Sequence, residues 1–129
     1  GDTVMSLLVE SLGPSCHVAN RADLYACLKV RFGESNHFWL SCEDPFPSLA
    51  VAVRDALASL HYFPEESHPG FICLGNEAIE GTQTLTIAWP RETIEVENRY
   101  VVSWQLALEA AEEFLVTQER PRCLQWFEL

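Results

Sequence analysis

The middle of the chain is a series of short apolar segments separated by turn-forming residues, and this pattern constrains the fold most strongly. Residues 49–53 alternate Leu and Val with Ala, and residues 56–63 continue with side chains that are common in strands. Further strands are predicted over residues 37–42 and 71–74, each followed by turn formers. Successive strands joined by short turns predict an antiparallel meander.

Two segments with helical periodicity flank this meander. Asn20 is a predicted N-cap, and the apolar residues after it recur at helical spacing until Gly33, which predicts a helix over residues 20–32. Ser103 is the predicted N-cap of a second helix, which should end near Gln118 because Pro121 follows soon after.

The rest of the chain supplies outer strands. Residues 4–12 are mostly apolar and predict a first strand, with a short helix as the alternative, and residues 123–127 predict a final short strand. Residues 82–89 alternate polar and apolar, and residues 93–96 predict an edge segment. We expect an α+β fold, a mostly antiparallel sheet with two main helices packed on it, in a single domain over residues 1–129.

The charge balance narrows the classes of partner. Nineteen Asp and Glu stand against eight Lys and Arg, so the formal net charge is −11, while apolar residues make up 48% of the chain. That apolar share excludes a disordered chain. The negative charge should repel phosphate backbones, so direct binding to nucleic acid is not expected, whereas a basic protein would be attracted. The alternative is that the charge serves solubility alone.

The cysteines and the start of the chain bear on location. The five cysteines are odd in number and widely spaced, which favours reduced thiols in a cytoplasm over a disulfide framework. The first residues lack the basic start of a secretory signal, and no segment is apolar enough to span a bilayer. We therefore expect a cytoplasmic protein that does not bind membranes.

No set of residues in the sequence predicts an enzyme. There is no CxxC pair, no HExxH motif and no Gly-rich phosphate loop, so we assign no catalytic, metal-binding or cofactor-binding residue. A Cys–His pair formed in space stays an alternative, because such partners need not be neighbours in sequence. His61, in a predicted strand, is expected to be structural, and His68 is expected in an exposed turn, as a contact or merely solvated.

Acidic residues gather in the predicted loops at strand ends, where binding surfaces are commonly built. The turn at residues 64–70 is the leading candidate for recognition, ahead of residues 92–97. Trp39 and Trp126 should belong to the core, whereas Trp89 and Trp104 are more open to contact with a partner. The predicted partner-binding residues are Glu43, Asp44, Glu65, Glu66, His68, Glu77, Trp89, Glu92 and Glu95.

Two segments carry a more specific pattern. The first is Leu-His-Tyr-Phe-Pro at residues 60–64, followed by His-Pro-Gly-Phe at 68–71 and Gly-Asn at 75–76. The second is Ala-Leu-Glu-Ala-Ala-Glu-Glu-Phe at residues 107–114, followed by Glu-Arg-Pro and Leu-Gln-Trp. Together they resemble immunity protein family one of bacterial polymorphic toxin systems, over about the C-terminal two-thirds of the chain. A Gly that is common in that family near position 118 is replaced here by Gln118.

This resemblance implies a cytoplasmic antidote that binds and neutralises a cognate toxin. Several such families are paired with nucleic-acid deaminase toxins, often delivered by contact-dependent or type VI secretion. A deaminase of this kind needs a basic groove for its substrate, and an acidic protein can occlude that groove. The alternative from another class is an adaptor or chaperone-like binding module for a secreted effector, which would bind without protecting the cell.

Overall fold

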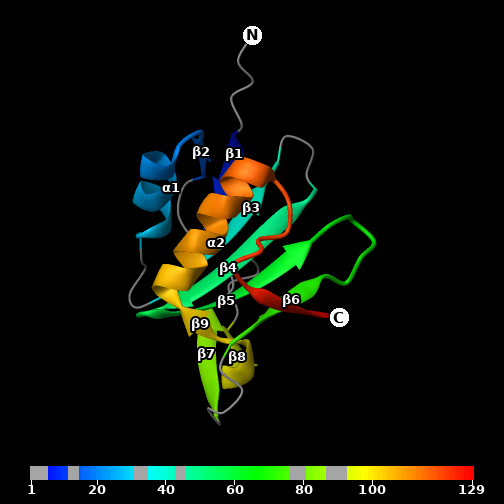
Figure 1. Cartoon of the computed structure of the whole chain (residues 1–129). Helices are drawn as coiled ribbons and strands as arrows, with labels where there is room; N and C mark the ends of the chain where they lie inside the picture. Colours follow the sequence, from blue (N-terminus) through cyan, green and yellow to red (C-terminus); the bar gives the residue numbers. More distant parts are fainter. Residues whose placement is uncertain (1–5, 12–14, 31–34, 43–45, 76–80, 87–92) are drawn as a thin grey trace.

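The computed structural model describes the backbone of residues 6–11, 15–30, 35–42, 46–75, 81–86 and 93–129. The side chains of residues 35, 83–86 and 93–94 lie outside this description. Within the described residues, a mostly antiparallel sheet carries two α-helices on one face, which confirms the predicted α+β class (Figure 1).

The main sheet has eight strands, seven of which follow the order β10-β6-β5-β4-β3-β1-β2, while the short β9 pairs with β5. All neighbouring strands are antiparallel. Their bounds are β1 Leu7–Glu10, β2 Cys16–Val18, β3 Ser35–Ser41, β4 Ser48–Arg54, β5 Leu57–Phe63, β6 Phe71–Leu74, β9 Val102–Ser103 and β10 Gln125–Glu128.

The predicted meander is confirmed, and its register explains the core. β4 and β5 pair so that Val51 lies opposite Leu60 and Val53 opposite Ala58. These four side chains are fully buried and belong to the main hydrophobic cluster. The turn between the two strands lacks Gly, and Asp55 takes the left-handed conformation there with φ 54°. Asp tolerates this region better than most residues because its short side chain can bond locally.

Helix α1 (Arg21–Leu28) begins as predicted and ends earlier than predicted. The Asn20 side chain accepts a hydrogen bond from the backbone N–H of Asp23 at 2.8 Å, which satisfies one free donor of the first turn. The helix ends at Leu28, so the expected continuation to residue 32 is wrong, and the predicted stop at Gly33 lies outside the described residues. Leu24 and Leu28 are its buried residues, one turn apart on a single face.

Helix α2 (Trp104–Thr117) agrees with the sequence at both ends. Ser103 Oγ accepts from the backbone N–H of Leu106 at 3.1 Å. At the C-terminus Gln118 takes the left-handed conformation with φ 53°, where the family that the sequence resembles favours Gly. The apolar stripe that includes Ala110 and Phe114 is fully buried and lies across β4 and β5 (Figure 1).

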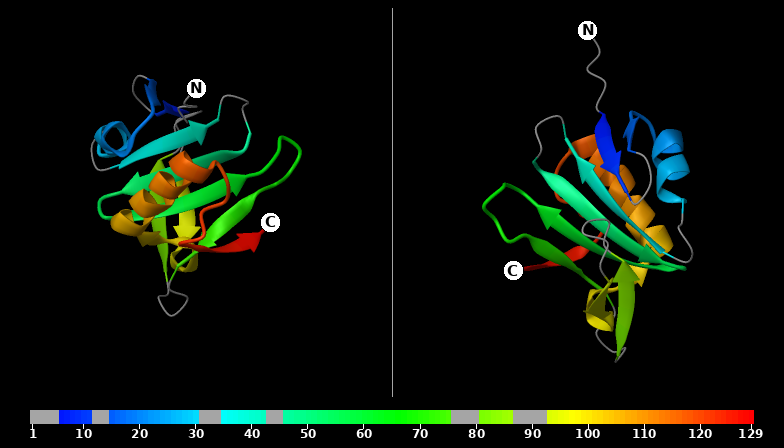
Figure 2. Two further views of the ribbon diagram at one scale, coloured as in Figure 1. Left: turned by 45° about the horizontal axis from the view of Figure 1, so that its top comes forward. Right: turned by 180° about the vertical axis from the view of Figure 1, so that it is seen from behind.

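A second, two-stranded sheet consists of β7 (Thr82–Thr86) and β8 (Thr93–Glu97). The predicted edge segment is therefore a strand paired with β7, and the end of the predicted strand over residues 82–89 lies outside the described residues. β7 contacts β3 and β4, and Val96 packs with Ala52 in a separate small cluster. The view from behind in Figure 2 shows this small sheet at one end of the main sheet.

Trp39 lies on the face of β3 that points away from the main core. Its neighbours Phe38 and Leu40 are buried in that core, and side chains alternate along a strand. Trp39 is half-buried and stacks on Phe63 with ring centroids 5.2 Å apart, so its expected place in the core is wrong. Trp104 is also half-buried and packs against the main core.

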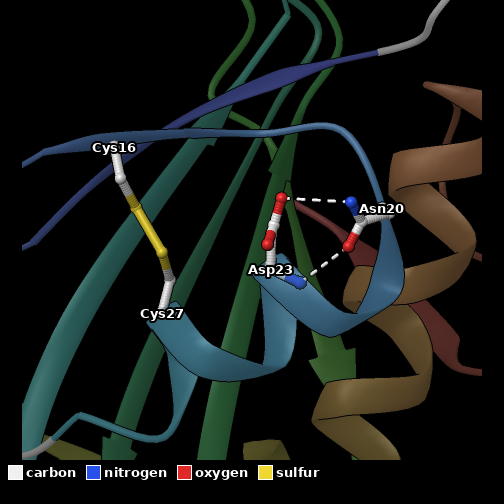
Figure 3. Close-up of a disulfide and its surroundings, with 4 residues drawn as sticks. All are labelled: Cys16, Asn20, Asp23 and Cys27. Carbon is white, nitrogen blue, oxygen red and sulfur yellow. Dashed lines mark hydrogen bonds between the residues drawn. A yellow bond between two sulfur atoms is a disulfide. The ribbon is translucent and has the colours of Figure 1, made fainter.

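A short strand that the sequence did not predict brings two cysteines together. β2 pairs with β1, and Cys16 at its start forms a disulfide with Cys27 of α1 (Figure 3). The expectation of reduced thiols is wrong for this pair, because α1 packs against β2 and so places residues that are 11 apart in sequence side by side. Cys73 is a buried free thiol, and Cys123 is an exposed one.

Candidate partner-binding surface

The turn at residues 64–70 connects β5 to β6 and is held by its own backbone and by His68. His68 N–H donates to the Glu65 carbonyl at 3.2 Å, and Gly70 N–H donates to His68 Nδ1 at 2.8 Å. Gly70 has φ 98°, and a Cβ there would lie 2.8 Å from the Phe63 ring, so the turn requires glycine at this position. The leading recognition candidate is thus an ordered turn.

His68 is more than a solvated turn residue. Its Nε2 lies 3.1 Å from Glu128 Oε2 of β10, and its ring stacks on Phe71 at a centroid distance of 5.1 Å. Leu129 N–H also donates to the Gly70 carbonyl at 2.9 Å. These contacts join the turn to the C-terminal strand, which is 60 residues away in sequence from His68.

A cavity of about 560 Å³ opens beside this turn. Its apolar lining comes from Tyr62, Pro64, Phe71, Leu124 and Trp126. Residues 119–122, which follow α2, complete its lining. Most of these residues belong to the two segments that resemble the immunity family, and the fold brings those segments to one place.

The segment after α2 is fixed as one wall of the cavity. The Glu113 carboxylate accepts from the backbone N–H of Arg122 at 2.5 Å and from that of Cys123 at 3.2 Å. Trp126 Nε1 donates to the Pro121 carbonyl at 2.8 Å. Hydrogen bonds to a charged acceptor are stronger than neutral ones, so this wall is held in place without any partner.

Aromatic contacts join Tyr62 to other residues that line the cavity. Tyr62 packs against Phe114, Trp126 and Phe71, with ring centroids 6.2 to 6.3 Å apart. Burial raises the pKa of the Tyr62 hydroxyl, and the charges of Cys42 and Glu119 add to this effect while Arg120 opposes it. Tyr62 therefore remains a neutral hydroxyl at physiological pH.

Two arginines lie at the cavity in an otherwise acidic protein. The Arg120 guanidinium lies over the Phe71 ring, 4.7 Å from its centroid. Arg120 and Arg122 are both exposed, and neither forms an ion pair with the residues that the structure describes. Glu119 also lines the cavity, Glu65 and Glu66 lie in the neighbouring turn, and all three side chains are exposed. The surface is therefore of mixed charge.

The structure places only some of the predicted binding residues. Glu65, Glu66 and His68 lie in the turn beside the cavity, and Glu95 is exposed on β8, at another end of the sheet (Figures 1 and 2). The described part of the chain therefore does not bring Glu95 together with the turn. The remaining predicted residues, Glu43, Asp44, Glu77, Trp89 and Glu92, lie outside the described residues.

The sequence reasoning missed the residues after α2 as part of a surface. The local pattern assigns Pro121 to a helix stop and Trp126 to the core. Trp126 is half-buried and packs on the main cluster, yet it also lines the cavity. The signal that could have found them was their presence in the second family-like segment, which local patterns alone explain as structural.

The described residues contain no group of three His, Cys, Asp or Glu side chains that could hold a metal ion. None of the helices in this part of the chain has the length and apolar character needed to cross a membrane.

Comparison with known proteins gives two results. The family model described as immunity protein Imm1 matches residues 13–128 of this chain. The chain is also 30% identical, over 97 residues, to the double-stranded DNA deaminase immunity protein of Burkholderia cenocepacia strain H111. The match covers 74% of this chain and 77% of that protein.

Proposed function

The chain belongs to the Imm1 family of immunity proteins, which neutralise toxins, and from this premise we propose that its cognate toxin is a nucleic-acid deaminase domain. The observation that carries the proposal is the 30% identity to a protein whose name specifies immunity to a double-stranded DNA deaminase. We further propose that the chain acts in the bacterial cytoplasm as a non-catalytic inhibitor that occludes the active site of the toxin with an acidic surface.

The charge of the chain supports this mechanism. A deaminase acting on nucleic acid needs a positively charged groove and a pocket for the base. A chain with net charge −11 would be attracted to such a groove over long distances, which speeds encounter. Exposed carboxylates could then take the positions of phosphate groups and exclude the substrate.

The turn at residues 64–70 is the proposed point of contact. Glu65 and Glu66 are exposed there, and the contacts of His68 and Gly70 hold the backbone in one conformation. A preformed turn loses little conformational entropy on binding, which favours affinity. In this proposal the turn presents its carboxylates to the basic groove of the toxin.

Co-expression tests the function directly. Cells that express the toxin domain encoded beside this gene should survive only when this chain is also made. The purified chain should abolish deamination of double-stranded DNA by that domain at a ratio near one to one. Binding without protection or inhibition would instead indicate an adaptor for a secreted effector.

Charge reversal tests the acidic surface. The double variant Glu65→Lys/Glu66→Lys should slow association with the toxin domain by roughly tenfold at low salt, and this difference should shrink at high salt. The matched control is Glu10→Lys/Glu109→Lys, which makes the same charge change at exposed positions on β1 and α2. If the two double variants associate equally fast at every salt concentration, the acidic turn is not the contact. The variant Glu92→Lys tests the second candidate segment, residues 92–97, by the same measurement of association rate at low and high salt.

A further inference from the structure

We propose that the cavity beside the 64–70 turn receives an apolar side chain of the toxin, and that Arg120 and Arg122 pair with a carboxylate next to that side chain. The proposal rests on the toxin binding proposed above and names the chemistry of the toxin segment that this surface recognises. It differs from the acidic surface mechanism, in which the carboxylates lie on this chain.

The cavity has the composition of a pocket for an anchoring side chain. Tyr62, Phe71, Leu124 and Trp126 supply apolar surface, and the volume of about 560 Å³ is ample for one large side chain. Its walls are already formed, because the Glu113 carboxylate accepts hydrogen bonds from the backbone of residues 122–123 and Trp126 donates one to the Pro121 carbonyl. Anchors that fill preformed pockets carry most of the affinity in many protein interfaces.

The two arginines determine what must lie beside that anchor. The chain has eight cationic side chains of Lys and Arg, and two of them line this one cavity. Neither is neutralised by an ion pair within the described part of the chain. Stacking on Phe71 orients the Arg120 guanidinium, and an oriented guanidinium can bind a carboxylate through two parallel hydrogen bonds. The complementary group is therefore an Asp or Glu of the partner.

This arrangement would give selectivity that net charge cannot supply. Long-range attraction draws the acidic chain to any basic protein, whereas a cationic pair at one cavity repels basic partners that lack a carboxylate in the matching place. A toxin is then accepted when an acidic residue and an apolar residue lie side by side on its surface.

Single charge reversals test the proposal. The probe is the toxin domain encoded beside the gene, and its dissociation constant is measured for Arg120→Glu, Arg122→Glu and the control Arg21→Glu. All three variants change the net charge equally, and Arg21 is exposed at the start of α1. We expect Arg120→Glu and Arg122→Glu to bind at least tenfold more weakly at both low and high salt, and Arg21→Glu to stay within about twofold of the original chain.

Two further measurements keep the outcome clear. Arg120→Gln removes the charge while keeping a planar polar group, so an equal loss of affinity excludes a folding defect caused by Glu, and thermal unfolding of each variant checks this independently. Variants of the toxin domain with single Asp or Glu residues changed to Arg should include one that restores binding to Arg122→Glu.

The possible failures can be told apart. If the unaltered chain does not bind the toxin domain, the proposed function fails. If it binds and both cavity variants behave like Arg21→Glu, the function stands and the cavity proposal is overturned. The cavity proposal is also overturned if Arg122→Glu abolishes self-association of the chain, measured by sedimentation, and leaves toxin binding unchanged.

Discussion

Glu113 Oε2 lies 2.5 Å from the backbone nitrogen of Arg122, so a side chain of α2 holds the segment that forms one wall of the cavity. The other oxygen of the same carboxylate accepts from the backbone N–H of Cys123. Glu113 thus satisfies two donors of a turn that no helix or sheet pairs. It connects the fold of the protein to the shape of its candidate binding surface.

Replacing Glu113 with Ala should lower the free energy of unfolding by about 1–3 kcal/mol, because two hydrogen bonds to a charged acceptor are lost. Urea unfolding measures this value. The matched control is Glu109→Ala on the same helix, which removes an equal charge at an exposed position and should have little effect.

The same variant should change the chemistry of Cys123. Partial burial raises the pKa of the Cys123 thiol to about 11, and the carboxylates of Glu113 and Glu109 contribute to the increase. Loss of Glu113 should lower this pKa and speed alkylation of the thiol at pH 8, since the thiolate is the reactive form. Equal stability of the Glu113 and Glu109 variants, with no rise in the labelling rate when Glu113 is removed, would contradict the role assigned to Glu113.

His37 should make the protein less stable in mild acid. Burial, with a smaller contribution from His61, lowers the pKa of His37 to about 4 from an ordinary value of 6.5. The unfolded chain therefore binds more protons between these values, and stability falls as the pH drops through this window. The full difference corresponds to about 3 kcal/mol, lost mostly between pH 6.5 and pH 4.

Chemical unfolding at several pH values, compared between the original chain and His37→Asn, measures this contribution. The variant should show a shallower decline in stability over that window, with the remaining slope due in part to His61, whose pKa burial also lowers. Parallel curves for the two proteins would show that His37 is accessible to protons in the folded state.

Replacing Gly75 with Ala should destabilise the chain by about 1–3 kcal/mol through overpacking. Gly75 follows β6, and its N–H donates to the Arg99 carbonyl at 2.6 Å within the link to the 3₁₀ turn Asn98–Tyr100. A Cβ on Gly75 would collide with the Val101 carbonyl oxygen. A Gly-to-Ala change at a site without such a clash usually stabilises a protein slightly. A lower melting temperature of Gly75→Ala would therefore support the predicted clash, and an unchanged or higher one would contradict it.

The sequence predicted the main helices and strands correctly where interactions between residues close in sequence form them. The side chains of the N-caps Asn20 and Ser103 each accept a hydrogen bond from the backbone N–H three residues ahead. Strand β6 has turn-forming residues before and after it. The alternation in β4 and β5 follows from the two-residue period of a strand. The C-terminal end of α1 was predicted less well, since the helix ends at Leu28 with Lys29 as its C-cap, and neither Gly nor Pro stands there in the sequence to mark the end.

Which side chains of a strand point into the core could not be predicted from such local patterns. Trp39 and Phe38 are adjacent, apolar and in one strand, yet only Phe38 faces the helices. Which of the two points inward depends on the register of β3 against β4, and that register is a property of the whole sheet.

Residues that are close in sequence determined the antiparallel meander, the two capped helices and the acidic character of this chain. The three-dimensional fold alone decided the Cys16–Cys27 contact, the binding of His68 to Glu128 and the cavity beside Tyr62. The physical reason is the sequence separation of the interacting residues, since helix caps and strand alternation depend on neighbours only a few residues away. The cavity instead arises where β5, the end of α2 and β10 meet, and a linear pattern does not encode that meeting directly.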